Sequence, residues 1–325
     1  MLKYCIKRIL LAFLILFGVS VILYVLVRNI DPIALYQQVA GMQVDQEEFV
    51  KQLQDQYGIG GNNIFKGYFT WLWNFVRGDF GESIKYKQPV EDVIFKNMGV
   101  SFAISLIALV LQLVIAIPLG IQCAVNQYGK LDYTATFLTM IGISFPTFFF
   151  GSIVIKVFAV DLGWFPTQGL ETANMPIGTS PIVQFFDIVW HLILPLSVLV
   201  ILSIGSWSRY TRTNTLEVLN ADYIRTARAK GLSERSVIYK HVFRNSLIPL
   251  VTVLAGTLPS LFGGAMITET IFAIPGIGKI AYDAMMGGDV PFIMGYNMFL
   301  AVLTVVGILL TDIMYAVVDP RVKLS

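Results

Sequence analysis

Charged residues are scarce in this chain of 325 amino acids. Only 14% of the residues are Asp, Glu, Lys or Arg, whereas a soluble domain carries about 25%, and 56% are hydrophobic. This composition excludes an ordinary soluble domain and favours a protein that crosses a membrane several times. The net charge of +2 is too small to indicate binding to nucleic acid.

Side chains and motifs of common catalytic sites are also scarce. The chain has two cysteines and two histidines, and it contains no H-E-x-x-H, C-x-x-C or G-x-S-x-G motif. The stretch Gly276-Ile277-Gly278-Lys279 departs from the phosphate-binding loop, because Ala273 stands at the first glycine position and Ile280 replaces the final hydroxyl residue. We therefore expect no catalytic site, no bound cofactor and no metal in this chain.

Six apolar windows are long enough to cross a bilayer, whose hydrocarbon core of about 30 Å takes about 20 helical residues. They are Ile9–Val27, Val100–Cys123, Tyr133–Val160, Ile188–Trp207, Leu247–Phe272 and Phe292–Val318. Lys and Arg number three before the first window, one in 124–132, eight in 208–246 and two in the tail. The alternate loops 161–187 and 273–291 have none and one. Because cytoplasmic loops are enriched in Lys and Arg, both termini are predicted to be cytoplasmic.

These windows predict an all-α polytopic membrane protein with four regions. Residues 1–27 form the cytoplasmic N-terminus and first span, and residues 28–99 form an extracytoplasmic segment. Residues 100–318 form a five-span core with a cytoplasmic loop at 208–246, and 319–325 form a cytoplasmic tail. The first window exceeds the apolar core of about 7–15 residues in a signal peptide, so we expect it to stay uncleaved.

The extracytoplasmic segment is predicted to be mostly helical. Gln46–Tyr57 has the composition of a polar helix, and Asn62–Val76 is dense in aromatic residues. Aromatic side chains suit the boundary between headgroups and hydrocarbon, so the second helix is expected on the membrane surface or on the bundle.

The cytoplasmic loop 208–246 has the pattern of two short helices around a turn. Gly231 follows the first helix at the position that commonly adopts the left-handed conformation at a helix C-terminus. Ser233 with Glu234 suits the start of a second helix. The apolar positions at helical spacing are Leu216, Leu219, Tyr223 and Ala227 before the turn, and Val237, Ile238, His241 and Val242 after it. A solvated basic loop is the alternative, but charge bias alone does not account for this pattern.

Three residues at membrane depth are candidates for a transport pathway: Glu269, Asp312 and Pro146. Buried ionisable groups in a membrane are costly, so they are functional candidates. Glu269 could meet a substrate ammonium at the outer mouth or pair with a neighbouring subunit, whereas Asp312 is expected to pair with a basic residue of the cytoplasmic loop. Pro146 is expected to bend the third span, which suits a pathway but is also common in membrane bundles.

Residues Asp222–Ser233, with the sequence DYIRTARAKGLS, resemble the coupling loop of ABC importer permeases. The resemblance is to the B-type subunit of the dipeptide, oligopeptide and nickel group. Further matches are Gly78-Asp79-Phe80-Gly81, Gly163-Trp164-Phe165-Pro166, Glu269–Gly278 and Asp319-Pro320-Arg321. In place of the wider family's E-A-A, this chain has Arg225-Thr226-Ala227, which is the form found in the peptide-permease branch.

This resemblance implies the type I importer fold and a permease subunit in the cell membrane. The implied partners are a homologous but non-identical permease, two cytoplasmic ATPase subunits that hold ATP and Mg, an extracytoplasmic solute-binding protein, and membrane lipid. Peptides are the implied substrates, with nickel or another small solute as the alternative. The residues implied in ATPase coupling are Arg225, Ala227, Arg228, Ala229, Lys230, Gly231, Ser233, Glu234 and Arg235.

A secondary transporter or channel is the alternative from another class. Such a protein would be expected to show charged groups at mid-depth or inverted repeats. Neither feature is visible in the sequence.

Overall fold

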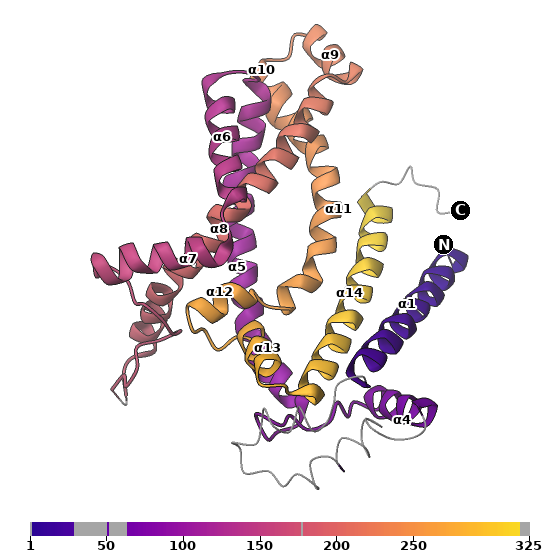
Figure 1. Ribbon diagram of the computed structural model, residues 1–325. Coiled ribbons are helices and arrows are strands. Elements are labelled where there is room, and N and C mark those ends of the chain that lie inside the picture. Colours follow the sequence, from indigo (N-terminus) through magenta and orange to yellow (C-terminus); the bar gives the residue numbers. More distant parts are fainter. Residues whose placement is uncertain (1, 29–50, 52–63, 177, 319–325) are drawn as a thin grey trace.

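The computed structural model describes residues 2–28, 51, 64–176 and 178–318 (Figure 1). In these ranges the regular structure is helical apart from one β-bridge between Glu82 and Pro89. The α-helices are α1 (Leu2–Arg28), α4 (Ile64–Val76), α5 (Val90–Val125), α6 (Lys130–Ser144), α7 (Thr147–Val154), α8 (Pro181–Leu219), α9 (Asp222–Ala229), α10 (Glu234–Ser236), α11 (Phe243–Phe262), α12 (Met266–Ile271), α13 (Ile277–Met286) and α14 (Val290–Val318). Two π-helical segments, η2 (Ile155–Asp161) and η3 (Val237–Val242), follow α7 and α10.

Helices α5 and α8 pack against one another and form the centre of the molecule (Figure 1). The two backbones come close at Gly120 of α5, where a Cβ atom would lie 2.6 Å from the carbonyl oxygen of Ser208. Nearer the other end, Ile104 of α5 joins a buried cluster with Leu192 and Val198 of α8. A glycine contact at one end and an apolar cluster at the other hold the pair along its length.

Helices α11, α14 and α1 form the other side of the bundle. Gly307 of α14 faces the ring of Pro259 in α11 so closely that a Cβ atom could not fit there. Helix α1 packs against α14, and its Ser20 hydroxyl shares a hydrogen bond of 2.7 Å with the Tyr68 hydroxyl of α4. The first span therefore lies at the edge of the bundle, fastened to the aromatic helix α4.

The prediction of six spans is confirmed when each of two bent helix pairs is counted as one span. Helices α1, α5, α8 and α14 are each long and apolar enough to cross a bilayer. The third predicted span is bent by 100° between α6 and the α7–η2 segment, and the fifth is bent by 49° after Leu254. Two of the six predicted windows are therefore not single straight helices.

The third span bends at Phe145 and Pro146. Phe145 has extended backbone angles (φ −82°, ψ 126°), as expected of a residue that precedes proline. Pro146 precedes the first residue of α7 and has no N–H to continue the hydrogen bonds of α6. The predicted bend is confirmed, and at 100° it is a change of direction rather than a kink.

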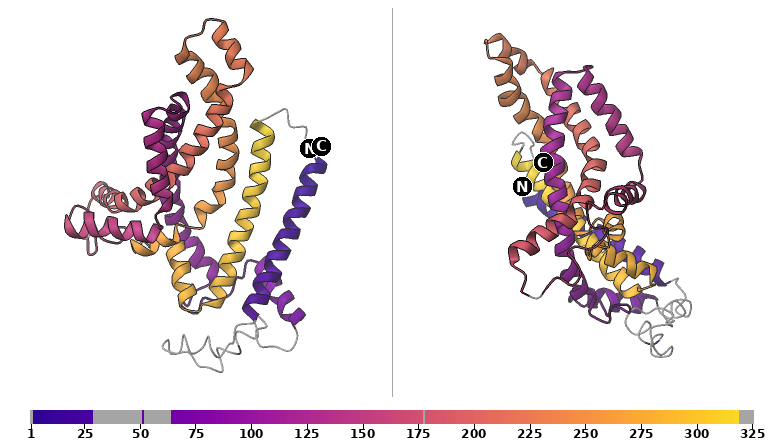
Figure 2. Two further views of the ribbon diagram at one scale, coloured as in Figure 1. Left: turned by 45° about the horizontal axis from the view of Figure 1, so that its top comes forward. Right: turned by 90° about the vertical axis from the view of Figure 1, so that its left-hand side faces the viewer.

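The elements fall on two sides of the bundle in the alternation that the sequence predicted. Helices α9 and α10 lie at the same end as the beginning of α1 and the end of α14, and α4 and α13 lie at the opposite end (Figures 1 and 2). In the predicted extracytoplasmic segment, α4 confirms the aromatic helix. The predicted polar helix Gln46–Tyr57, apart from residue 51, and the tail 319–325 lie outside the described residues.

Candidate coupling element and pathway residues

Residues 222–242, which comprise α9, α10 and η3, fold into a projecting elbow with a core of its own (Figure 1). Ile224 and Ala227 of the first arm pack against Val237 and Val242 of the second. Val218 and Leu219, at the end of α8, pack against the same cluster. The elbow is therefore a folded element joined to α8 by apolar packing, and its second arm continues without a loop into α11.

The turn of the elbow has the two caps predicted from the sequence. Helix α9 ends at Ala229, and Gly231 has φ +77°, the left-handed conformation that glycine adopts without cost. Ser233 begins the second arm, where its hydroxyl oxygen accepts a hydrogen bond from the Ser236 N–H at 3.4 Å. These local interactions confirm the helix–glycine–helix prediction.

An ion pair joins the two arms across the turn. The Nη2 of Arg228 donates to Oε1 of Glu234 at 2.6 Å and the Nε of Arg228 donates to Oε2 at 3.1 Å. The Arg228 guanidinium holds the pKa of the Glu234 carboxyl below its usual range. Because both side chains are about half exposed, this pair contributes at most about 1 kcal/mol, and its main effect is to fix the turn.

The outer surface of the elbow is basic with exposed apolar side chains between the charges. The exposed residues include Arg225, Ala229, Lys230, Gly231, Leu232, Arg235, Tyr223 and Tyr239, and the acidic residues Asp222 and Glu234 are exposed as well. Of the apolar positions at helical spacing before the turn, Tyr223 is exposed in the structure. Ile224 takes the inner position instead, and Ala227 lies with it in the core.

Glu269 in α12 is buried, with 1% of its surface exposed. Its Oε1 accepts hydrogen bonds from Ser101 Oγ at 2.7 Å and from the Ala265 N–H at 3.0 Å. Its Oε2 accepts from the Lys279 N–H at 3.0 Å. Within this chain the carboxylate ties together α5, α12 and the start of α13, and a substrate could reach it only if this network opened.

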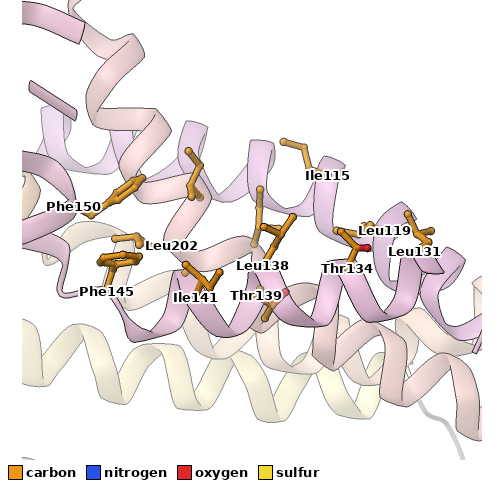
Figure 3. A pocket seen from close by; sticks show the side chains of 15 residues that line it. Ile115, Leu119, Leu131, Thr134, Leu138, Thr139, Ile141, Phe145, Phe150 and Leu202 are labelled. Atoms are coloured by element: carbon orange, nitrogen blue, oxygen red, sulfur yellow. The ribbon is translucent and has the colours of Figure 1, made fainter. Parts of the chain in front are cut away.

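Pro146 lies beside an apolar cavity of about 480 Å³ between α5, α6 and α8 (Figure 3). Phe145, the residue before Pro146, and Phe150 line one end of the cavity, and Leu119 and Leu131 line the other. Asp312 lies in α14, but its side chain is outside the described part of the structure. Glu269 is not among the residues that line this cavity, so the cavity does not join Glu269 to the break at Pro146.

Two networks were not predicted from the sequence. Arg212 of α8 forms an ion pair with Asp132 of α6. Asp289 is fully buried before α14, and its carboxylate accepts hydrogen bonds from the Ser83 hydroxyl at 2.5 Å and from the backbone N–H groups of Ile84 and Lys85. The partners lie 80 and about 205 positions apart in the sequence, so no local pattern links them.

Broken spans, an apolar exterior and one projecting polar elbow define an integral membrane protein of the transporter class. Residues 116–324 match the family described as binding-protein-dependent transport system inner membrane component. The chain is 41% identical to the oligopeptide transport system permease protein AppB of Bacillus subtilis (strain 168), over 99% of this chain and 100% of that protein. It is 37% identical to the dipeptide transport system permease protein DppB of the same strain, over 86% and 85% of the two chains.

The fold also matches a solved structure, the inward-facing MetNI methionine ABC transporter. The TM-score is 0.51 at 18% identity, over 70% of this chain and 96% of that chain. The chain belongs to the family of binding-protein-dependent transport system inner membrane components. It is a multi-pass permease component of an ABC importer with the type I importer fold, and is not itself catalytic.

Proposed function

We propose that this chain forms half of a translocation pathway for dipeptides and oligopeptides. The other half is a homologous, non-identical permease, and an extracytoplasmic binding protein delivers the peptide. Two ATPase subunits, which hold ATP and Mg, dock on the elbow from the cytoplasm. The relatives named for oligopeptide and dipeptide transport, at 41% and 37% identity, support the substrate class.

The observation that carries the coupling role is the core of the elbow. An unfolded basic loop could bind a partner but could not transmit its movement. Ile224, Ala227, Val237 and Val242 make the elbow a rigid body, and Val218 and Leu219 continue this packing into α8. A displacement of a docked ATPase would therefore move α8 and α11 together with the elbow.

The break in the third span supports a place for Pro146 beside the pathway. Among the described residues no side chain caps the start of α7, and the first N–H groups of a helix have no partner within the helix itself. Open backbone groups at membrane depth are tolerated where protein covers them or where they line a water-filled cavity. A second permease or an aqueous pathway satisfies this need, and lipid does not.

The test is reconstitution with the partner permease, the ATPases and the binding protein of the same transport system. We expect ATP-dependent uptake of tritiated trialanine and pentaalanine, and copurification of the ATPases with this chain. Competition by unlabelled dialanine but not by Ni²⁺ would support the peptide assignment. Uptake of ⁶³Ni²⁺ without peptide uptake would contradict the substrate class, and uphill uptake by this chain alone would contradict the importer mechanism.

A further inference from the structure

Arg212, near the cytoplasmic end of α8, forms a two-pronged ion pair with Asp132 in the first turn of α6. Its Nε donates to Oδ1 at 2.6 Å and its Nη2 donates to Oδ2 at 2.7 Å. The Tyr128 N–H donates a third hydrogen bond to the Asp132 carboxylate at 3.0 Å. A guanidinium that binds both oxygens fixes orientation as well as distance. The pair therefore sets how the beginning of α6 lies on α8.

Besides this ion pair, α6 is held by the short turn 126–129 that joins it to α5 and by contacts along α8 that bury few of its own residues. Asp132 is the only residue of α6 that is buried. Apolar residues further along the helix are exposed, including Phe137 at 64% and Leu138 at 61%. The second firm contact is at Gly205 of α8, where a Cβ atom would overlap the Thr139 side chain. Of the contacts between α6 and α8, the ion pair is the one made by a buried residue of α6, and the approach at Gly205 is the closest.

Helix α8 connects this ion pair directly to the elbow. Arg212 lies about 10 Å from the end of α8, because each helical residue rises 1.5 Å. At that end, Leu219 packs against the core of the elbow. One turn before Arg212, the α8 backbone packs tightly on Gly120 of α5. The elbow, the end of α8 and α5 therefore form a packed unit, to which α6 is added by the ion pair.

We propose that Arg212 and Asp132 are positioning residues that carry a displacement of the elbow to α6, and through α6 to the break at Phe145 and Pro146. This inference rests on the proposed function, because it requires ATPase partners that move the elbow. Without the ion pair, the beginning of α6 is no longer held in a fixed orientation on α8, and α6 no longer follows the movement of α8 closely. The consequence is uncoupling of ATP hydrolysis from transport. ATP is still hydrolysed, but the third span, which is broken at Phe145 and Pro146, no longer moves with the elbow.

The test uses the assembled complex with Arg212→Gln. Spin labels are placed on the exposed positions Phe137 of α6 and Met286 of α13, after both native cysteines have been replaced by alanine. Pulsed electron paramagnetic resonance then measures the distance between the labels without nucleotide and with ATP plus vanadate. With the native pair we expect the distance to change on adding ATP and vanadate. With Arg212→Gln we expect the change to be lost and trialanine uptake per ATP to fall by about tenfold.

The matched control is the exposed ion pair between Lys156 and Asp161, with Nζ to Oδ1 at 2.9 Å, removed by Lys156→Gln with Asp161→Asn. These changes should leave the movement and the uptake per ATP unaltered. Arg212→Lys keeps the positive charge but cannot donate to both carboxylate oxygens as the guanidinium does. It should therefore give an intermediate loss of uptake per ATP.

Three outcomes would overturn the inference. In the Arg212→Gln complex, ATP hydrolysis and uptake could fall in proportion, which would give the pair a purely stabilising role. The distance change could also persist in that complex, which would show that other contacts move α6. Finally, the complex with the native pair could hydrolyse ATP without any movement of α6. If instead the native complex neither bound ATPases nor hydrolysed ATP, the proposed function itself would fail.

Discussion

Oε1 of Glu269 accepts a hydrogen bond from the Ser101 hydroxyl at 2.7 Å, joining α12 to α5 across 168 positions of the sequence. Ser101 in turn accepts a hydrogen bond from the Ile277 N–H at 2.8 Å. Both side chains are buried, at 1% and 0% exposure. The two residues therefore fasten the loop that separates the fifth span from α13, which is predicted to be extracytoplasmic, onto the central helix α5.

This arrangement predicts that Glu269→Gln destabilises the subunit. Both carboxylate oxygens accept backbone N–H groups, those of Ala265 and Lys279. An amide side chain supplies one acceptor only, so its NH₂ group must face one of these donors. The expected cost is about 1–3 kcal/mol, measured as a lower midpoint of thermal unfolding of the purified complex.

Ser101→Ala tests the same network from the other helix. It leaves the Ile277 N–H without a partner, and should also lower the unfolding midpoint by an amount equivalent to about 1–3 kcal/mol. The variant with both Glu269→Gln and Ser101→Ala should lose less unfolding free energy than the sum of the losses in the two single variants, because the two residues share one hydrogen bond. A Glu269→Gln complex with normal thermal stability but altered uptake would instead place Glu269 on the substrate pathway.

Gly276→Ala is expected to disrupt the outer loop. A Cβ atom at position 276 would lie 2.5 Å from both the Glu269 carboxyl carbon and Ser101 Oγ. Neither group can move without breaking the network, so the complex should assemble in low yield. Gly99→Ala in α5 is the matched control, because no atom lies within 4 Å of its added Cβ and helical alanine is favoured by about 0.5–1 kcal/mol. Equal yields of the two variants would disprove the clash.

Gly231→Asp and Gly231→Asn are both expected to abolish ATPase copurification and uptake. Apart from its two chain neighbours, no described residue has an atom within 4 Å of a Cβ built at Gly231, and its φ of +77° is one that Asn and Asp tolerate. The added side chain would therefore point into the space that the proposed ATPase occupies, without unfolding the elbow.

The matched control for position 231 is Gly78→Asn. Gly78 has φ +89° and equally open surroundings, but it lies in the segment predicted to be extracytoplasmic. It should leave ATPase copurification intact. Normal uptake by either Gly231 variant would show that the turn of the elbow is not part of the surface on which the ATPase docks.

Ala227→Glu and Ala229→Glu are predicted to fail in different ways. Ala227 is 7% exposed in the core of the elbow, and an unpaired buried charge there should cost about 4 kcal/mol or more. Ala229 is exposed, so its replacement should leave the elbow folded and weaken only ATPase binding. Limited proteolysis should cut the elbow of the Ala227 variant rapidly and that of the Ala229 variant slowly. Equal rates of cleavage in the two variants would show that burial of Ala227 does not stabilise the folded elbow.

The elbow was predictable because its signals are local. Helix periodicity, the left-handed preference of Gly231 and the capping hydroxyl of Ser233 act over a few residues, and the structure confirms them. The same spacing did not identify Ile224, which is buried in the core of the elbow, while Tyr223 beside it is exposed.

The spans were determined by the sequence alone, and their sidedness is predicted by it, because both follow from the free energy of placing apolar and basic side chains in or beside a bilayer. The tertiary structure alone decided that the third span turns by 100° at Pro146, that Glu269 is enclosed by Ser101, and that Asp132 meets Arg212. These pairs form between helices 80 to 168 positions apart in the sequence. An ionisable residue within an apolar window predicts that its carboxylate has a hydrogen-bond partner. The sequence does not identify that partner, because the packing of distant helices decides which donor lies beside it.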